Sequence, residues 1–520
     1  MPTIYGIVSR GYLPKELPPA FTSEVCGKVL GKNLSALPSE FTQSDKPSMN
    51  ASHNLLSRGS LRRKLGIPNP TNFLRLVGFV VDNWSLLTSI AANSHISMTI
   101  PVAERRPRAI GSRSTFADRA NRRANLRSES RYVLQADISQ LYHSIYTHSI
   151  SWAIHGKGTA KAKRTDRALL GNVLDRLVRN SQDQQSVGIP IGPDTSFLIA
   201  EMILSVNDVR LLNKGIRNGF RAIDDYEFGF DSLNEAESCR ETLQETLNEY
   251  ELVLNADKTG VIELPVPIES LAISRLRDCA FSTADRGKQR NQIMYYFDEA
   301  FVFSREQPDE SILKYAVSRL SGISVLKENC QLCEDLLLQC VIVDPSTLQQ
   351  VLNQLLKYKD AGYSLNLDHI AEVFNKVIGK HARLGHGSEV AWAVWGLIVL
   401  GLPVSDNSAA EAANMNDSIV AILILDARAK GLVSSGVSFD HLKSYMSTKD
   451  LYGEQWLLAY EANVKGWLPS LGKRDHVQQD RCFAFLKSRG VYFYDNNVSG
   501  RMTYKPPKPP ARGAAGGEAY

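Results

Sequence analysis

The stretch "FRAIDDYEFGF" (residues 220–230) holds two adjacent aspartates, Asp224 and Asp225, between two short apolar runs. This pattern predicts a β-hairpin with the aspartates at its tip. Two carboxylates about 4 Å apart repel each other by about 4 kcal/mol at an effective dielectric constant of about 20. A fold retains such a pair where a divalent cation offsets the repulsion, although aspartates are also common in plain turns. The pair by itself leaves a metal site and a turn as alternatives.

A third acid and the order of the elements favour the metal site. Asp137 ends the β-rich run "RYVLQAD", and a long apolar helix is predicted over residues 192–212. The hairpin follows, then an amphipathic helix over 236–250 and a strand turn that carries Lys258. In this βαββαβ-like pattern, neighbouring central strands bring Asp137 next to Asp224.

Three clustered carboxylates predict a particular kind of metal centre. Oxygen-only ligands favour Mg²⁺ or Mn²⁺ over Zn²⁺. Such clusters hold two ions about 3.5–4 Å apart, of which one activates an attacking hydroxyl and the other steadies a leaving pyrophosphate. We therefore expect Asp137, Asp224 and Asp225 to bind two Mg²⁺ (or Mn²⁺) ions.

The charge of the chain is mild overall but concentrated in one segment. With 520 residues, 43% of them hydrophobic and 22% charged, the composition is that of a globular protein of several domains, and the net charge is +5. Eight arginines follow Glu104, with few acids among them: Arg105, Arg106, Arg108, Arg113, Arg119, Arg122, Arg123 and Arg127. Such a stripe suits a phosphate-rich partner, and a solvated basic surface is the alternative.

Cysteine usage and hydropathy predict a soluble cytoplasmic protein with no membrane partner. The seven cysteines are scattered, and Cys330 and Cys333 form a C-x-x-C with no second pair at zinc spacing, which favours apolar fillers in a helix. The first residues have no signal-peptide core. The most apolar stretch, 391–404, is too short to span a bilayer.

The chain divides into regions of different character. Residues 1–55 are rich in Pro, Ser and Asn and predict an irregular extension, and a helical pattern precedes the break "IPNPTN". Residues 56–295 contain the mixed pattern described above. Helix after helix is predicted over 296–500, in pairs near the period of HEAT-type units but without a repeating residue signature. The Pro/Gly-rich tail 501–520 predicts disorder.

Four motifs in order resemble those of reverse transcriptases, and more closely the bacterial abortive-infection enzymes of the AbiA/AbiK type. "QADISQLYHSIYTHSI" resembles the first palm motif, "VGIPIGPDTS" the second, "AIDDYEF" the third and "LNADKTG" the fourth. The resemblance implies an α+β palm-and-fingers fold, with helices packed on an antiparallel sheet, followed by an all-α helical-repeat domain. It also implies an RNA-directed DNA polymerase, a nucleotidyltransferase that acts in antiphage defence.

The resemblance assigns roles to residues at matching positions. Asp137, Asp224 and Asp225 become catalytic metal ligands, helped by the backbone carbonyl of Ile138, and Lys258 becomes the acid that protonates pyrophosphate. The resemblance also implies residues that contact the substrate. Tyr142 would exclude the ribose 2′-OH, and Gly188 and Gly192 would let the backbone approach the incoming base and the template. The triphosphate would be held by Arg105, Arg106 and Arg108. Without the resemblance, each of these residues has another interpretation: Tyr142 can be an aromatic residue of the core, and Lys258 can be a solvated lysine.

Two departures from the family leave the kind of synthesis open. Ala222 stands where the family usually has Tyr or Phe, and Val187 where many members have Gln. Untemplated, protein-primed DNA synthesis, known in some defence members, fits these positions. The alternative is a catalytically inactive protein that binds nucleic acid and acts as a scaffold. The expected partners are dNTPs, a DNA product, an RNA template and further copies of the chain bound through its helical half.

Overall fold

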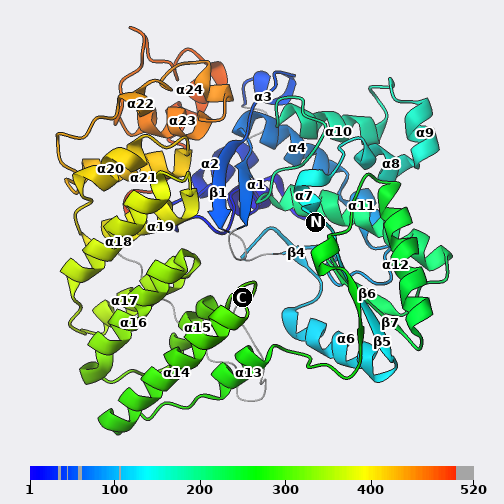
Figure 1. Cartoon of the computed structure of the whole chain (residues 1–520). Helices are drawn as coiled ribbons and strands as arrows, with labels where there is room; N and C mark the ends of the chain where they lie inside the picture. Colours follow the sequence, from blue (N-terminus) through cyan, green and yellow to red (C-terminus); the bar gives the residue numbers. More distant parts are fainter. Residues whose placement is uncertain (33–36, 44, 57–60, 105–106, 499–520) are drawn as a thin grey trace.

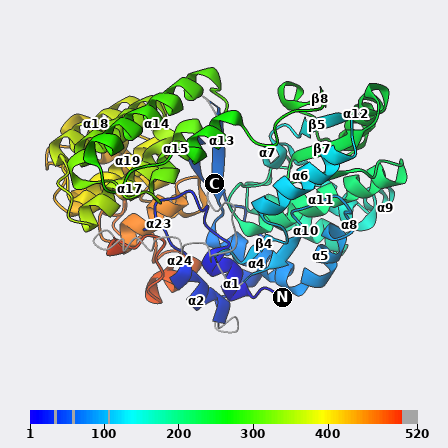
Figure 2. The ribbon, with the colours of Figure 1, turned by 90° about the horizontal axis from the view of Figure 1, so that it is seen from below.

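The computed structural model describes residues 1–32, 37–43, 45–56, 61–104 and 107–498. Two lobes lie side by side, one built around a four-stranded sheet and one built of helices (Figure 1). The N-terminal helices lie between them at the base of the molecule (Figure 2). The coarse prediction of an α+β part followed by a helical part is confirmed. The predicted tail, 501–520, lies outside the described residues.

The central sheet has the strand order β6-β7-β5-β8, and each neighbouring pair is antiparallel. Its strands are β5 (Tyr132–Asp137), β6 (Gly219–Ala222), β7 (Asp225–Phe230) and β8 (Gly260–Glu263). The connecting helices are α11 (Asp194–Asn213) before β6 and α12 (Leu233–Asn248) before β8. This is the split βαβ arrangement, so the predicted βαββαβ order is confirmed.

The strand β5 is central because its apolar residues are covered on both faces. Val133 and Leu134 point to opposite faces and are both fully buried. Asp137 is the last residue of the strand, and it pairs across the ladder with the first residue of β7. The sheet therefore brings the predicted acids to one edge.

Smaller elements surround this edge of the sheet. They are α4 (Pro70–Asp82), α5 (Trp84–Ala91), β3 (Pro101–Ala103), β4 (Ile110–Ser112), α6 (Phe116–Ser128), α7 (Leu141–Ser144), α8 (Ser149–His155), α9 (Lys157–Ala162) and α10 (Leu170–Asn180). The break "IPNPTN" becomes the start of α4, with Asn69 as N-cap and Pro70 in the first turn. The helical segment between the first two motifs, α8 to α10, forms one face of the α+β lobe (Figure 1).

The helical pattern predicted before that break is wrong. Residues there form an antiparallel ribbon of β1 (Ala51–Leu56) and β2 (Arg62–Ile67). The ribbon packs against α19 (Gly387–Leu400) of the helical lobe, where buried His53 Nδ1 lies 2.8 Å from Asp417 Oδ2. Tertiary packing has overridden the local helical pattern.

The prediction of an irregular extension over residues 1–55 is also wrong. The segment forms α1 (Ile4–Arg10), α2 (Glu24–Lys32) and α3 (Glu40–Gln43) as well as β1. The segment is hydrogen-bonded to residues 493–495. The Thr22 N–H donates to the Phe493 carbonyl oxygen at 2.9 Å, and the Asp495 N–H donates to the Ala20 carbonyl oxygen at 2.8 Å. Buried side chains such as Ile7 and Phe41 stabilise these helices despite a composition typical of loops.

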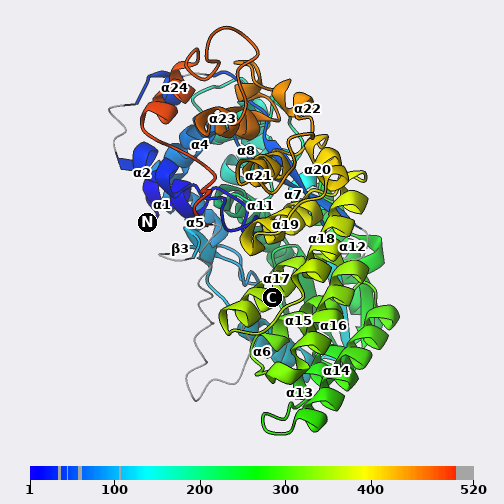
Figure 3. The ribbon, with the colours of Figure 1, turned by 90° about the vertical axis from the view of Figure 1, so that its left-hand side faces the viewer.

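The helical lobe is a stack of two rows. Its helices are α13 (Leu271–Asp278), α14 (Arg286–Glu306), α15 (Ile312–Leu320), α16 (Cys330–Val343), α17 (Leu348–Asp360), α18 (Leu367–Ala382), α19, α20 (Asp406–Ala413), α21 (Ser418–Ala429), α22 (Asp440–Lys443), α23 (Trp456–Val464) and α24 (Arg481–Ser488). Helices α15, α17, α19, α21 and α23 pack in succession as one row, and α14, α16, α18 and α20 as the other (Figure 3). The expected boundary at residue 295 falls inside α14.

The cysteines and the apolar helices bear on two of the predictions from sequence. The seven cysteines are free, and Cys330 and Cys333 are buried in α16 as predicted. Among the described residues no single helix is long and apolar enough to cross a bilayer, whereas the pair α4 and α5, bent by 75°, meets that test of length and composition.

Candidate active site

The turn between β6 and β7 consists of Ile223 and Asp224 and is held under strain. Ile223 has a φ of +57°, which is rare for a β-branched residue. Its N–H donates to Thr99 Oγ1 at 3.1 Å, and its carbonyl oxygen accepts from Arg221 Nη1 at 3.0 Å. These bonds fix the backbone directly before Asp224, so the hairpin tip is a positioned element.

The three predicted acids meet at this tip. Asp137 and Asp225 are direct partners across the β5–β7 ladder, where opposing Cα atoms lie about 4.5–5.5 Å apart. Next to them, Ile138 N–H donates to the backbone oxygen of Asp224 at 3.1 Å. The juxtaposition of Asp137 with the aspartate pair, predicted from the order of elements, is present in the structure.

The carboxyl groups disfavour each other's ionisation. Burial raises the pKa of Asp224 to about 6, and the charges of Asp225 and Asp137 add to the shift. Burial also raises the pKa of Asp137; Lys258 opposes this, and the Asp225 carboxyl adds to it by charge and by a hydrogen bond. A bound cation would relieve both effects, because it favours the ionised carboxylates.

Cationic and amide side chains already contact two of the acids. Lys258 Nζ lies 3.1 Å from Asp137 Oδ2, and Arg119 Nη2 lies 3.1 Å from Asp225 Oδ2. Asn255 Nδ2 is 3.3 Å from Asp137 Oδ1. Lys258 therefore contacts the acidic cluster through Asp137, and its role as the acid stays a prediction.

Asp137 and Asp225 each pair with a cation, and the three aspartates do not form a group in which one ligand atom from each lies within 4.8 Å of the others. Within the described residues, the acid and histidine groups with ligand atoms all within 4.8 Å of one another lie in the helical lobe. They are His381 with His386 and Glu389, and Glu334 with Asp335 and His369. The aspartates offer only oxygen ligands, which fits Mg²⁺ or Mn²⁺, and binding there requires Asp137 and Asp225 to exchange their present partners for the ion.

A buried ion cluster lies behind the hairpin. Arg221, Glu201 and Asp208 have fully buried side chains, and the guanidinium lies 2.9 Å from Glu201 and 2.8 Å from Asp208. Hydroxyl groups satisfy the remaining carboxylate oxygens: those of Ser94, Ser97, Thr99 and Tyr226. Such a network is stable only when every member is paired, so it holds β6, α11 and the hairpin in one arrangement.

Tyr142, expected beside the ribose, lies next to this cluster. Burial raises the pKa of its hydroxyl, and the nearby charges of Glu201 and Asp224 raise it further. Its carbonyl oxygen accepts from Ile189 N–H at 2.7 Å, which ties the first motif to the second. The charge of Asp224 thus acts on the Tyr142 hydroxyl, and the role of the ring beside a ribose stays a prediction.

The two glycines of the second motif are required by the chain's own packing. Gly188 has a φ of +85°, and an added Cβ would lie 3.1 Å from the carbonyl oxygen of His143. Gly192 has a φ of +131°, and an added Cβ would lie 2.5 Å from Cγ of Pro14. We therefore replace the predicted contact of Gly192 with template by a structural contact with the N-terminal segment.

Arg108 also has a different role from the one predicted. Its guanidinium donates to Asp194 Oδ1 and to the carbonyl oxygens of Leu13 and Gly192, each at 2.7 Å. These bonds connect the N-terminal segment to the start of α11. They also use the guanidinium N–H groups that would otherwise donate to a triphosphate. Arg105 and Arg106, the other predicted triphosphate residues, lie outside the described residues.

Three further arginines of the stripe form ion pairs within the protein. On α6, Arg119 pairs with Asp225, and Arg123 pairs with buried Glu227, both acids of β7. Arg127, one turn further, lies 3.9 Å from Glu227. This spacing of four residues places one face of α6 against the sheet, so these three arginines are not free to bind phosphate.

Four residues near the aspartates were not assigned a role from the sequence: Arg63, Arg119, Arg221 and Asn255. Arg63, on β2, is exposed and its charge lowers the pKa of both Asp224 and Tyr142. The run "LRRKLG" offered a signal for Arg63, but the ribbon had been interpreted as helix. Arg221 directly precedes the third motif and Asn255 lies within the fourth, and their positions beside the motifs are the signal that could have found them.

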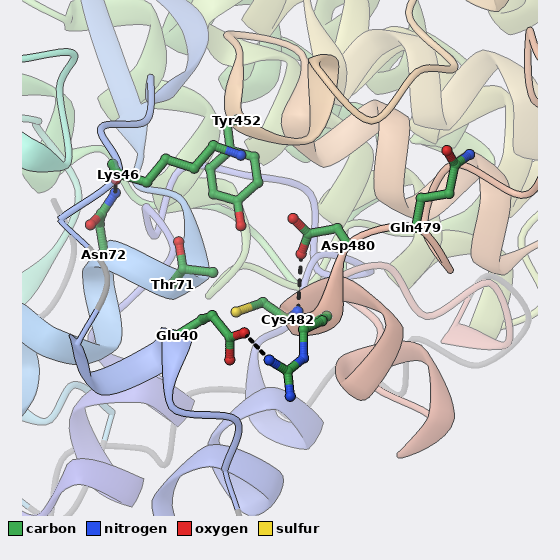
Figure 4. Close-up of a pocket in the computed structure, with 9 residues that line it drawn as sticks. Glu40, Lys46, Thr71, Asn72, Tyr452, Gln479, Asp480 and Cys482 are labelled. Atoms are coloured by element: carbon green, nitrogen blue, oxygen red, sulfur yellow. Dashed lines mark hydrogen bonds and ion pairs between the residues drawn. The ribbon is translucent and has the colours of Figure 1, made fainter.

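A small cavity of about 260 Å³ lies apart from the aspartates, where the N-terminal region meets α24 (Figure 4). Lys46 Nζ lies 3.2 Å from the centre of the Tyr452 ring, and Glu40 pairs with Arg481 at 2.6 Å. Asp480 caps α24 through the N–H of Cys482. These contacts join the two ends of the chain, and we assign the cavity a structural role.

Comparisons with protein-family models and with curated proteins found no match. Among solved structures the chain is similar to apo telomerase from Candida tropicalis, with 10% identity and a TM-score of 0.33 over 59% of this chain and 64% of that one. It is also similar to telomerase from Candida albicans in complex with a TWJ fragment of telomeric RNA (10% identity, TM-score 0.31, 65% of each chain). The corresponding Candida tropicalis complex gives 11% identity and a TM-score of 0.31 over 60% of this chain and 59% of that one. The chain thus covers less than two thirds of each telomerase.

Proposed function

We propose that this protein is a metal-dependent nucleotidyltransferase of the reverse-transcriptase type that polymerises deoxynucleotides. The observation that carries the proposal is the meeting of Asp137, Asp224 and Asp225 at one edge of a split βαβ sheet. The raised pKa of Asp224, about 6, reflects first its burial and then repulsion by Asp225 and Asp137, a cost that a fold without use for the acids has no reason to retain. The four motifs in order support the same activity.

Asp137, Asp224, Asp225 and the Ile138 carbonyl are the groups that would hold two Mg²⁺ or Mn²⁺ ions. When bound, the ions supply an activated primer hydroxyl and charge compensation for the pyrophosphate. The protein's own contribution is positioning: the strained turn at Ile223, fixed by Arg221 and Thr99, sets the direction of Asp224.

Other side chains act on the substrate in this proposal. Lys258 holds a proton at Nζ, 3.1 Å from Asp137, and donates it to the leaving pyrophosphate. The Tyr142 ring leaves no space for a ribose 2′-OH and selects deoxynucleotides. Arg63 replaces Arg108 as the guanidinium for the triphosphate, because it is exposed and acts on Asp224.

The test is incorporation of labelled dNTPs by the full-length protein with Mg²⁺, with and without an RNA or DNA template. Wild type should form polymer, and Asp224→Asn with Asp225→Asn should abolish it. Asp298→Asn, an exposed acid of α14, is the matched control and should leave incorporation unchanged. Equal synthesis by the double variant and wild type would refute the proposal.

The finer parts of the proposal rest on the resemblance of the motifs to abortive-infection enzymes. They are antiphage defence, protein-primed and untemplated synthesis, and self-association through the helical lobe. Mass analysis of protein purified from cells tests priming, because a primed chain carries covalently attached DNA.

A second candidate is a nucleic-acid-binding scaffold that does not catalyse. The ion pairs of Lys258 with Asp137 and Arg119 with Asp225 favour it, since they already compensate two of the acids. It predicts salt-dependent binding of nucleic acid with no consumption of dNTPs.

A further inference from the structure

A cavity of about 870 Å³ lies on the face formed by α8, α9 and α10. We call it the α8–α10 pocket, and the residues used below to define it are Tyr146, Trp152, Lys161, Arg164, Arg167 and Arg176. Its volume is within the range of about 300–1,000 Å³ typical of ligand sites. Neither the aspartates nor Lys258 line it, so it is separate from the candidate active site.

The pocket carries an excess of positive charge. Of its three acids, Asp175 is held by His148 at 2.7 Å and by Arg179 at 3.2 Å, and Asp45 by Arg75 at 2.9 Å. The third, Asp166, lies between Arg164 and Arg167 in the sequence and accepts a hydrogen bond from the Ala168 N–H at 2.9 Å. In the described part of the chain, by contrast, no acid lies within ion-pair distance of the four cations Lys161, Arg164, Arg167 and Arg176. An anionic ligand is the partner that this arrangement fits.

One of these cations has a donor that is buried and unused. Arg176 Nε is inaccessible to solvent and has no hydrogen-bond partner among the described residues. Arg164 and Arg167 are exposed and lie in the loop between α9 and α10. Guanidinium groups match phosphate oxygens in geometry as well as in charge.

Aromatic rings stand beside the cations. The Tyr146 ring lies edge-on to Trp152, with centroids 5.6 Å apart, and edge-on to His148 at 4.9 Å. Lys161 Nζ is 5.7 Å from the Trp152 ring centre. Basic groups interleaved with aromatic rings are the chemistry that binds single-stranded nucleic acid, by phosphate contact and base stacking.

The pocket is connected to the active site by a short ladder. Tyr146 forms a β-bridge with Val187, and Thr147 N–H donates to Ser186 at 2.8 Å. Two residues after Val187, the Ile189 N–H donates to the carbonyl oxygen of Tyr142, a residue on whose hydroxyl the charge of Asp224 acts. A second, smaller cavity of about 170 Å³ is lined by His143, Val187 and Gly188 of these bonded segments. Two cavities that adjoin one pair of segments suit an extended strand better than a single nucleotide.

We propose that the α8–α10 pocket binds the sugar-phosphate backbone of single-stranded nucleic acid and leads the strand toward the aspartates. The binding itself is independent of catalysis, whereas the identification of the strand as substrate rests on the proposed function. A free nucleotide shares the phosphate chemistry, and the experiment distinguishes the two sources.

The test is fluorescence anisotropy of a labelled single-stranded DNA of about 12 nucleotides, comparable to the sites of other strand-binding proteins, in EDTA and at several salt concentrations. The variant is Arg164→Gln with Arg167→Gln, and the matched control is Lys473→Gln with Arg474→Gln, an exposed basic pair of the helical lobe. The pocket variant should bind at least about tenfold more weakly and lower the slope of log affinity against log salt by about 1.4, for two lost phosphate contacts. The control should match wild type.

Each alternative result is decisive. Equal binding by the pocket variant and wild type overturns the proposal, as does an equal loss in the control. If dATP displaces the DNA at concentrations that saturate a nucleotide site, and the variant loses dATP binding as well, the pocket is a nucleotide site and the strand proposal is wrong. Because the assay contains no divalent ion, absence of polymerase activity would refute the proposed function and leave this result intact.

Discussion

Arg221 donates a hydrogen bond of 3.0 Å to the carbonyl oxygen of Ile223, the residue that precedes Asp224. The same guanidinium neutralises buried Glu201 and Asp208. A single side chain therefore balances the charge behind the hairpin and fixes the backbone directly before Asp224. In the proposed function, stability and catalysis are coupled at this residue.

Arg221→Met should unfold the α+β lobe at lower temperature and abolish incorporation. Removing one partner of a buried ion pair costs about 3–5 kcal/mol, because the carboxylates stay buried without compensation. Thr99→Val removes only the hydroxyl that accepts from Ile223 and donates to Glu201, and should cost about 1–3 kcal/mol. Thermal unfolding monitored by circular dichroism measures both. A wild-type midpoint for Arg221→Met would contradict the role given to the cluster.

Asp224→Asn should stabilise the protein at neutral pH when no metal is present. Its pKa of about 6 lies above the value of about 3.9 for an unfolded chain, so ionisation favours unfolding. The destabilisation grows as the pH rises from about 4 to 6 and is complete above that, at about 3 kcal/mol. Urea unfolding at pH 4.5 and 7.5 should show a variant advantage about three times larger at the higher pH. Asp298→Asn should show no such difference.

Mg²⁺ should raise the thermal midpoint of wild type and not that of Asp137→Asn with Asp224→Asn. A ligand at 100 times its Kd stabilises the native state by about 2.7 kcal/mol. Mg²⁺ suits this test because it prefers oxygen ligands and avoids the histidine cluster at His381. Differential scanning fluorimetry with a Mg²⁺ titration is the measurement, and an equal shift in the double variant would place the ion elsewhere.

Tyr142→Val should relax selection against ribonucleotides. With the ring gone, the ratio of kcat/KM for dNTP over NTP should fall by about tenfold or more, whereas kcat/KM for dNTP changes little. The backbone bond from Ile189 is retained in this variant. Steady-state incorporation of paired dNTP and NTP substrates tests it, and an unchanged ratio would show that the ring serves only the core.

Arg108→Met and Arg63→Met should separate a structural arginine from a substrate arginine. The first removes bonds to Asp194, Leu13 and Gly192 and should lower the thermal midpoint, at a cost of about 1–3 kcal/mol, with KM for dNTP unchanged in the folded fraction. The second alters an exposed residue and should raise KM without loss of stability. The opposite pattern would restore the triphosphate role to Arg108.

Prediction from sequence succeeded where a motif and the strand order determine one geometry. Asp137 and Asp224 are 87 residues apart, and their meeting followed from the βαββαβ order alone. It failed where distant packing decides the structure: the β1–β2 ribbon and the N-terminal helices are stabilised by residues beyond position 380. Arg108 was misassigned because its partners, Leu13 and Asp194, become neighbours only in the fold.

The bonds from Ala20 and Thr22 to residues 493–495 also bear on how the protein is made. Ala20 and Thr22 cannot form these bonds until residues 493–495 have been translated, which takes roughly 25–100 s at about 5–20 residues per second. A product that stops before residue 493 lacks these bonds and leaves the surface around Ala20 and Thr22 uncovered.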